Sequence, residues 1–302
     1  MNETFDITPG YESWLSGHGL RCLDDAFAFS DGERLDKPGL ESWRQRWRIA
    51  VTDERGVAHR MYLKRFDRPP LGRQLARWRG GHLGRSTAGV EWQNARALAE
   101  AGIAAAGPIA FGQRMAGPWE IRSFILLREV VGTSLERWVP THLPALRDDH
   151  DSRGRRARCD RLARFVARFH RAGFVHRDLY LSHVFITLDE EPAATGTEGS
   201  ERFSLIDLQR VFRPRWRRRR WVVKDLAALN YSTPIDRVAR SERLRFLCRY
   251  VRVCDRFGSA RRLAREVGAK TARMARRRTP PRAEREPSAA LAGQSGNGWL
   301  ES

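Results

Sequence analysis

A short run of chemically useful residues lies in the second half of the sequence, where His176-Arg177-Asp178 is followed five residues after the aspartate by His183. An aspartate held in a loop can accept the proton of an attacking hydroxyl group, and a ligand placed a few residues later can help to hold a metal ion. The transfer of a phosphoryl group to an alcohol needs both. Because three letters can match by chance, the weight of this motif depends on the elements around it.

A second carboxylate is expected beside Asp178. Residues 184–188 predict a short strand directly after the motif, and residues 203–209 predict a second strand with Asp207 near its exit. If the two strands form a hairpin, Asp207 lies close to Asp178. Two carboxylates in one site repel each other unless a cation lies between them. The pair therefore predicts a divalent metal held by Asp207, with Asp178 free to orient a hydroxyl.

Candidate phosphate contacts come from the N-terminal part of the chain. Residues 46–51 and 60–66 predict two strands, and Lys64 stands near the end of the second. Upstream, residues 25–29 predict another strand that leads into a tight turn at 30–33. Gly32 in this turn would let backbone N–H groups approach phosphates without a side chain in the way. An ordinary hairpin and a solvated lysine are the alternatives.

A helix is expected at residues 88–100, with Ser86 or Thr87 as its cap. Glu91 shares a face with apolar residues of this helix and therefore points toward the body of the protein, where a carboxylate needs a cation. Lys64 is the natural partner. The alternative is that Glu91 only interacts with the dipole of the helix.

Sheet gives way to helix near residue 132. Residues 107–112 and 122–129 predict two further strands, and the second runs into a connection that ends at Gly132. Immediately afterwards Thr133 and Glu136 match a capping box. We place the boundary between two lobes here. In a kinase the backbone of this hinge, at Glu129 and Val131, would bind adenine.

Helical periodicity dominates the second half. Apolar residues from Leu162 to Phe169 predict a helix that Gly173 ends, and further helices are expected after Asp225 and at 241–257. Asp225 is expected to brace the backbone of the loop that contains His176-Arg177-Asp178. We call residues 174–186 the catalytic loop. The chain is thus predicted to be α+β, with a lightly ordered arm at 1–20, a sheet-rich lobe at 21–131, a helical lobe at 132–275 and a disordered tail at 276–302; residues 67–87 and 141–157 are expected to be loop and linker.

The composition indicates a soluble, folded protein with an anionic partner. Hydrophobic residues make up 41% of the chain, and 56 Lys and Arg against 36 Asp and Glu give a formal charge of +20. The acidic N-terminus lacks the features of a signal peptide, and no apolar run is long enough to span a membrane. We therefore expect a cytoplasmic location.

Together these motifs resemble the bacterial lipopolysaccharide core kinase family, which belongs to the protein-kinase-like superfamily. The resemblance covers roughly residues 22–255 and is carried by His-Arg-Asp-Leu-Tyr-Leu-Ser-His-Val-Phe-Ile at 176–186, Tyr-Leu-Lys at 62–64 and Trp-Val-Val-Lys-Asp-Leu-Ala at 221–227. Members of this family phosphorylate heptose or Kdo sugars of the inner core. The heptose kinases are the most similar because they share a histidine at the position of His183.

The resemblance implies a two-lobed protein-kinase-like fold, in which an antiparallel sheet with one helix forms the N-lobe and helices form most of the C-lobe. It also implies ATP and Mg²⁺ as cofactors and a sugar hydroxyl as acceptor. On this basis Asp178 is the base, Lys64 anchors phosphates with Glu91 as its partner, and Asp207 binds the metal. His183 either ligates the metal, hydrogen-bonds Asp178 or braces the loop.

An arginine-rich stretch at 210–221 occupies the position of a kinase activation segment. We expect it to contact an anionic glycolipid or a membrane surface at the inner face of the cytoplasmic membrane, whereas nucleic acid is the disfavoured partner. The basic residues concerned are Arg213, Arg215, Arg217, Arg218, Arg219 and Arg220. Two other functions stay open: an atypical protein kinase, and a weakly active kinase-like protein that binds membrane or nucleic acid.

Overall fold

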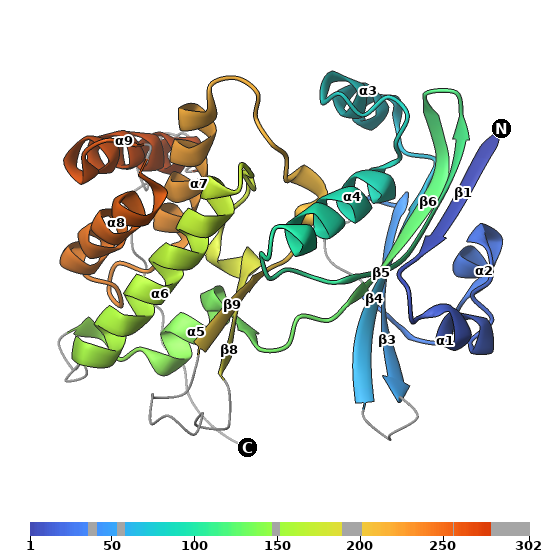
Figure 1. Cartoon of the computed structure of the whole chain (residues 1–302), viewed down its shortest axis with the longest axis horizontal. Helices are drawn as coiled ribbons and strands as arrows, with labels where there is room; N and C mark the ends of the chain where they lie inside the picture. Colours follow the sequence, from blue (N-terminus) through green and yellow to red (C-terminus); the bar gives the residue numbers. More distant parts are fainter. Residues whose placement is uncertain (36–40, 53–57, 147–151, 189–200, 256, 279–302) are drawn as a thin grey trace, which may run out of the picture.

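Antiparallel pairing joins the strands of the N-terminal half into one sheet, and helices make up most of the C-terminal half (Figure 1). The computed structural model describes residues 1–35, 41–52, 58–146, 152–188, 201–255 and 257–278. The sheet has the order β1-β5-β6-β4-β3-β2. Its strands are β1 (Asn2–Ile7), β2 (Glu33–Arg34), β3 (Arg44–Thr52), β4 (Ala58–Asp67), β5 (Pro108–Ala116) and β6 (Trp119–Arg128), and the helices of this lobe are α1 (Glu12–Gly17), α2 (Leu23–Ala28), α3 (Leu71–Arg79) and α4 (Thr87–Glu100).

Different helices cover the two faces of this sheet, because side chains alternate along each strand. Leu63 of β4 is fully buried in a cluster with Leu23 of α2. Phe66 packs on the opposite face with Trp92 of α4. Lys64 has the same parity as Phe66, so its side chain leaves the sheet on the side of α4. The predicted strands around Lys64 and the helix at 88–100 are therefore confirmed.

The first 20 residues differ from the lightly ordered arm that we expected. β1 pairs with β5 along its whole length, from Asn2 opposite Met115 to Ile7 opposite Ala110. The strand was missed because its residues are only partly buried, which leaves no clear alternation of apolar and polar side chains. Pairing with a neighbour distant in sequence creates this strand.

The expected strand at 25–29 is also wrong, because these residues form most of helix α2 and its end. The carboxylate of Asp25 accepts the backbone N–H groups of Arg21 at 2.8 Å and Cys22 at 3.0 Å, which caps the helix. Gly32 consequently precedes β2 instead of lying in a turn between two strands. A Cβ atom at Gly32 would lie 2.9 Å from the carbonyl oxygen of Arg48, so the glycine allows close packing on β3. The connection from β2 to β3 includes residues 36–40, which lie outside the described residues.

Residues 67–87 contain a helix where we expected a loop. Helix α3 begins directly after Pro70, a residue that helices tolerate at their start. The N-lobe therefore carries more than the one helix that the resemblance implied. The composition, rich in Arg, Gly and Pro, hid this helix because the side chains it buries are polar.

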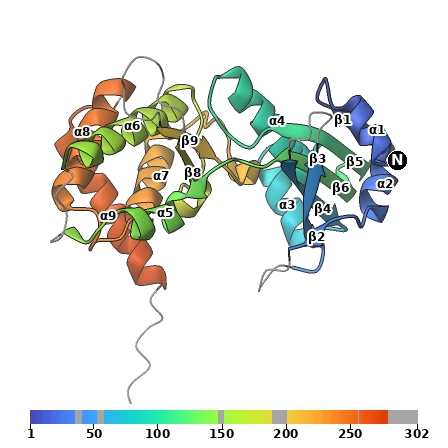
Figure 2. The ribbon, with the colours of Figure 1, turned by 90° about the horizontal axis from the view of Figure 1, so that it is seen from below.

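The C-lobe packs helices around a small second sheet (Figures 1 and 2). Its helices are α5 (Leu135–His142), α6 (Ser152–Arg171), α7 (Arg218–Ser232), α8 (Arg240–Cys254) and α9 (Ala260–Arg278), and its strands are β7 (Thr133–Ser134), β8 (Val184–Leu188) and β9 (Glu201–Leu205). The predicted hairpin is confirmed as β8 and β9. The two-lobed α+β fold that we expected is thus the observed one.

Three local predictions in this lobe are wrong. Thr133 belongs to β7 and Ser134 holds the N-cap position of α5 without a side-chain bond, so no capping box forms. Helix α6 already starts at Ser152, within the expected linker. Residues 276–278 of the expected tail end helix α9, and residues 279–302 lie outside the described residues.

The hinge between the lobes depends on Gly132. This residue has a φ of 106°, and a Cβ atom there would lie 2.2 Å from the carbonyl oxygen of Ile186 in β8. No side chain fits this approach. Glycine at this position therefore lets the connecting chain lie directly on the small sheet of the C-lobe.

Replacing Gly132 with alanine should destabilise the protein by about 3 kcal/mol, because backbone strain and steric overlap act together. Gly10 is a matched control, since it has a φ of 92° but open space around its Cβ position. Gly10→Ala should cost about 1 kcal/mol from backbone strain alone. Urea unfolding of both variants checks this difference, and equal losses would contradict the close approach.

Candidate active site

Lys64 and Glu91 form a buried ion pair between the sheet and helix α4. The Nζ atom of Lys64 lies 2.5 Å from Oε1 of Glu91, and the side chains are 11% and 0% exposed. A fully buried carboxylate is stable only with a cation and further hydrogen bonds. The predicted pairing is confirmed, and the alternatives of a solvated lysine and a glutamate that serves only the helix dipole are excluded.

Glu91 has a second partner that sequence analysis missed. The Nε2 atom of Gln209, two residues after Asp207, donates to Oε2 of Glu91 at 3.1 Å. Arg44 in turn donates to the amide oxygen of Gln209 at 3.2 Å. On the next turn of α4, the amide nitrogen of Asn94 donates to the carbonyl oxygens of Leu208 and Val211, each at 2.8 Å. Helix α4 thus holds both Lys64 and the segment that follows Asp207.

Asp225 of helix α7 fixes the catalytic loop. Its carboxylate is fully buried and accepts the backbone N–H groups of His176 at 2.6 Å and Arg177 at 2.7 Å. Arg177 has a φ of 70°, a conformation that ordinary residues adopt only when neighbouring bonds impose it. The bracing role expected for Asp225 follows directly from these contacts.

Asp178 stands between two cations. Its Oδ2 atom lies 2.6 Å from Nη1 of Arg210, and its Oδ1 atom lies 3.8 Å from Nζ of Lys224. Lys224 also donates to the carbonyl oxygen of Arg177. Burial lowers the pKa of Lys224, whereas the charge of Asp178 acts in the opposite direction. These contacts orient the carboxylate and surround it with positive charge.

His183 connects the two aspartates. Its Nδ1 atom lies 2.7 Å from the carbonyl oxygen of Asp178, and its Nε2 atom lies 3.8 Å from Oδ2 of Asp207. Because a carbonyl oxygen only accepts hydrogen bonds, Nδ1 carries a proton and the neutral ring has a lone pair at Nε2. That lone pair faces a carboxylate, an arrangement that favours a cation or a proton between the two atoms.

Asp207 is held as an anion. Burial opposes its ionisation, but the positive charge of Lys64, together with that of Arg46, outweighs this effect, so the pKa of Asp207 lies below its ordinary value. Its φ of 58° directs the chain away from the end of β9. Just before it, the carbonyl oxygen of Ile206 accepts a hydrogen bond from Nε2 of His176 at 3.0 Å, which ties Asp207 to the catalytic loop.

This donor set fits a cation that completes its coordination with other ligands. Among the described residues, no group of three or more His, Cys, Asp and Glu side chains is arranged to hold a metal. Mg²⁺ is commonly bound by one or two carboxylates together with substrate phosphates and water. Asp207 supplies such a carboxylate, and Nε2 of His183 faces the same position.

The family comparison agrees with this geometry. A sequence model of the lipopolysaccharide kinase (Kdo/WaaP) family matches residues 40–250. The chain belongs to this family. The match includes all the residues described above, from Arg44 in β3 to Lys224 and Asp225 in α7.

Individual members of the Kdo/WaaP family show the same relation. The lipopolysaccharide core heptose(I) kinase WaaP of Pseudomonas aeruginosa is 35% identical over 167 residues, which cover 54% of this chain and 58% of that protein. Its namesake in Escherichia coli K12 is 32% identical over 144 residues, 47% of this chain and 52% of that protein. The chain therefore spans about half the length of the curated relatives it matches. A solved structure of WaaP in complex with acyl carrier protein is 27% identical, with a TM-score of 0.64, and covers 91% of this chain and 97% of that one.

The hinge groups expected to bind adenine already have partners. The N–H of Glu129 donates to the carbonyl oxygen of Arg60 at 2.9 Å, and its carboxylate accepts from Tyr62. The carbonyl oxygen of Val131 accepts from Oγ1 of Thr187 at 2.6 Å. Adenine binding through Glu129 and Val131 stays a prediction, as does nucleotide contact by Gly32.

The arginines between residues 213 and 220 fall into three groups. Arg219 pairs with Glu266 at 2.9 Å and Arg218 donates to the carbonyl oxygen of His170, so both hold the C-lobe together. Arg213 stacks on Phe174 at 4.2 Å, and Arg220 lies 5.6 Å from the ring centre of Trp221. Arg215 and Arg217 are exposed on either side of Trp216, which is 81% exposed.

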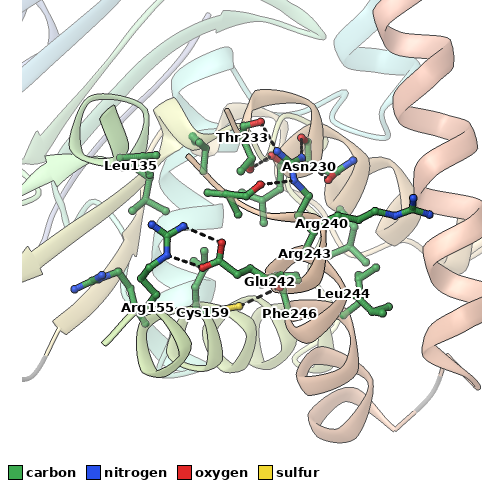
Figure 3. A pocket seen from close by; sticks show the side chains of 18 of the residues that line it. Leu135, Arg155, Cys159, Asn230, Thr233, Arg240, Glu242, Arg243, Leu244 and Phe246 are labelled. Carbon is green, nitrogen blue, oxygen red and sulfur yellow. Dashed lines mark hydrogen bonds and ion pairs between the residues drawn. The ribbon is translucent and has the colours of Figure 1, made fainter. Parts of the chain in front are cut away.

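An apolar cavity lies in the C-lobe, and Leu181 of the catalytic loop is part of its wall. It has a volume of about 440 Å³ and is enclosed by helices α5 to α9 (Figure 3). Leu135, Leu247 and Phe246 line its wall, and Arg155 pairs with Glu242 at 2.8 Å beside it. Burial, together with Asp160 and Glu242, raises the pKa of Cys159 in this wall to about 12, so its thiol stays neutral and unreactive.

Sequence reasoning located Asp178, Asp207, Lys64 and Glu91, and also Asp225, but missed three residues that contact them: Gln209, Arg210 and Lys224. Gln209 stands where protein kinases carry the glycine of Asp-Phe-Gly, and this departure was its only signal. Lys224 directly precedes Asp225 in the motif that carried the family resemblance. Arg210 had no signal beyond the general excess of arginine.

Asp225→Asn should destabilise the protein by about 2 kcal/mol, because the amide group can accept only one of the two backbone N–H groups and presents a donor to the other. Asp236→Asn is the control, since the side chain of Asp236 is 67% exposed and its replacement should change stability by less than about 0.5 kcal/mol. Urea unfolding measures both changes. Equal stability of the two variants would disprove the bracing role.

Proposed function

We propose that this chain is an ATP-dependent kinase that phosphorylates a sugar hydroxyl, heptose or Kdo, on the inner core of lipopolysaccharide or on a related glycolipid. The connection of Asp178 to Asp207 through His183 carries the proposal, because it joins a candidate base to a candidate metal ligand at one site. The WaaP relatives, which are heptose(I) kinases, favour heptose over Kdo.

The N-lobe would bind and orient the nucleotide. Lys64, oriented by Glu91, presents its ammonium group to the phosphates, as the corresponding lysine does in protein kinases. Asp207, with His183 beside it, would hold Mg²⁺, which neutralises charge on the phosphate oxygens when it is bound. Gln209 keeps Asp207 and Glu91 in a fixed relation.

The catalytic loop would bind the acceptor. Asp178 accepts the proton of the attacking hydroxyl, and the backbone bonds to Asp225 hold the loop during this step. Arg210 is 52% exposed and pairs with Oδ2 of Asp178. We expect the acceptor hydroxyl to displace the Arg210 side chain from this oxygen when it binds. Lys224 is less exposed, at 25%, and lies where it can stabilise negative charge on the transferred group.

Asp178→Asn should lower phosphate transfer from ATP by a factor of about 10² to 10⁴, because the amide keeps the shape of the side chain but accepts no proton. The assay follows labelled ATP with purified inner-core glycolipid, and Asp236→Asn serves as the control. Unchanged transfer would remove Asp178 from the mechanism. Transfer to protein instead of glycolipid would support an atypical protein kinase, and no transfer by the parent chain would support a binding protein.

We further propose that the C-lobe binds an acyl carrier protein. The WaaP structure described above was solved with such a partner. Here an apolar cavity of about 440 Å³ can accept an acyl chain; one face of α6 lines this cavity, and the opposite face of α6, together with α8, is basic. The arginines of this face are Arg153, Arg156, Arg161, Arg164 and Arg245. This combination fits an acidic protein that carries an apolar group.

The double variant Arg156→Glu with Arg164→Glu should bind an acyl-loaded carrier at least about tenfold more weakly, because two attractive contacts become repulsive. Arg96→Glu with Arg276→Glu is the matched control, since both residues are exposed on other helices. Calorimetric titration measures the affinities. The carrier without its acyl chain should also bind more weakly; equal binding of both forms would exclude the cavity.

Peripheral association with the inner face of the cytoplasmic membrane completes the proposed function. Arg215 and Arg217, on either side of the exposed Trp216, are suited to anionic headgroups. Arg218 and Arg219 contribute less, because each is bound within the C-lobe. In the part of the chain that the structure describes, no helix is both long and apolar enough to span a bilayer.

A further inference from the structure

Helix α3 turns its polar side chains inward. Gln74 and Arg77, one turn apart, are 6% and 9% exposed. Gln74 donates to the carbonyl oxygens of Pro69 and Glu120, and its own amide oxygen accepts the N–H of Glu120 at 2.9 Å. Arg77 donates to the carbonyl oxygens of His82, Arg85 and Pro118. A polar network therefore fixes the helix and the loop that follows it to the edge of the N-lobe.

The outer face of the same segment is apolar. Leu71 and Leu75, one turn apart on α3, are 66% and 40% exposed, and Leu83 in the following loop is 56% exposed. Trp78 packs edge-on against Trp119, with ring centres 4.5 Å apart, and Trp119 is itself 38% exposed. The usual amphipathic order is thus reversed, because a helix in a water-soluble protein normally directs its leucines to the core.

Basic residues surround these leucines. Arg68, Arg73, Arg79 and Arg85 are exposed, and residues 68–86 contain no aspartate or glutamate. Two acidic residues from outside the segment pair with it: Glu41 lies 3.2 Å from Arg73, and the buried Glu120 lies 3.7 Å from Arg77 on the inner side. Leucines, tryptophans and arginines on one face are the composition of helices that lie in the interface of anionic membranes.

We infer that the outer face of residues 68–86, with Leu71, Leu75 and Leu83 at its centre, docks the enzyme on an anionic phospholipid bilayer. Charge complementarity and the inward polar network carry this inference, since the leucines protrude from a segment whose geometry is already fixed. Figure 1 shows α3 and the segment that leads into α7 at the same upper edge of the molecule. The exposed Trp216 belongs to that second segment.

Such docking would orient the cleft toward a lipid-linked acceptor. Each lobe contributes one contact, and the catalytic loop lies close to the second, because Val175 pairs with Phe212 just before the exposed arginines. The inference rests on the proposed function only for this purpose. The bilayer contact itself needs neither ATP nor an acceptor.

The test replaces Leu71, Leu75 and Leu83 together with serine in the full chain. Because all three are exposed, the variant should keep its fold, and circular dichroism and urea unfolding confirm this first. Ile235→Ser with Leu188→Ser is the control, since these residues are 83% and 49% exposed in the C-lobe. Binding is measured by co-sedimentation with phosphatidylcholine vesicles, with and without phosphatidylglycerol, in the absence of nucleotide.

The parent chain and the control should bind vesicles that contain phosphatidylglycerol, and the triple variant should bind them at least about tenfold more weakly. Added salt should weaken binding of the parent, because the arginine contribution is screened. Equal vesicle binding by the triple variant and the parent would overturn the inference. So would binding of the segment to an acidic protein, such as an acyl carrier protein, with no binding to vesicles.

A second readout separates this inference from the proposed function. If both hold, the triple variant phosphorylates a water-soluble core oligosaccharide at the rate of the parent but loses activity on acceptor embedded in vesicles. If the parent binds vesicles through the leucines yet phosphorylates neither acceptor, docking stands and the kinase assignment fails. Equal activity of variant and parent on embedded acceptor would reject the orienting role.

Discussion

The buried carboxylate of Asp225 is the interaction on which the site depends. It accepts two successive N–H groups of the catalytic loop, while Nε2 of His170 lies 3.4 Å from one of its oxygens and Nδ1 of His170 lies 2.9 Å from the hydroxyl of Tyr250. Because these groups are fully buried, no water can replace a lost hydrogen bond. Loss of the carboxylate would therefore leave the backbone N–H groups of the loop without a partner and destabilise its conformation. The unusual backbone angle of Arg177 persists only under this constraint. Helices of the C-lobe core thereby determine where Asp178 stands.

In the N-lobe, too, a buried carboxylate holds two separate segments together. Glu91 is a buried anion with two partners, Lys64 from the sheet and Gln209 from the segment after Asp207. Next to this segment, His176 of the catalytic loop donates a hydrogen bond to the carbonyl oxygen of Ile206, the residue directly before Asp207. The two lobes therefore meet through a continuous set of buried polar contacts, and each member is held by bonds to residues distant in sequence. Such a set specifies one arrangement, because each unpaired group would be costly to leave buried.

The sequence predicted the parts of the site whose chemistry is local. Glu91 lies on a helix and Lys64 lies in a strand, whereas Asp178 and Asp207 lie in the connections before β8 and after β9. Each position follows from elements whose periodicity is visible in the sequence. Gln209, Arg210 and Lys224 could not be found in this way, since each acts through a contact with a residue distant in sequence. The same reason explains the fold errors: β1 exists through pairing with β5, and α3 buries glutamine and arginine instead of leucine. Gly32 was misplaced because the preceding aromatic residues belong to a helix capped by Asp25.

The replacement of glycine by Gln209 has a consequence for ligand binding. Gln209, two positions after the candidate metal ligand Asp207, donates to Glu91, which pairs with Lys64, so the segment after Asp207 and helix α4 cannot shift apart without breaking this bond. A ligand bound at Lys64 and a ligand bound at Asp207 would then influence each other's affinity. Thermodynamic linkage requires that each changes the affinity of the other by the same factor. If the proposed sites are correct, a phosphate group bound at Lys64 should raise the affinity of Asp207 for a cation, and a cation bound at Asp207 should raise the affinity of Lys64 for phosphate by the same factor.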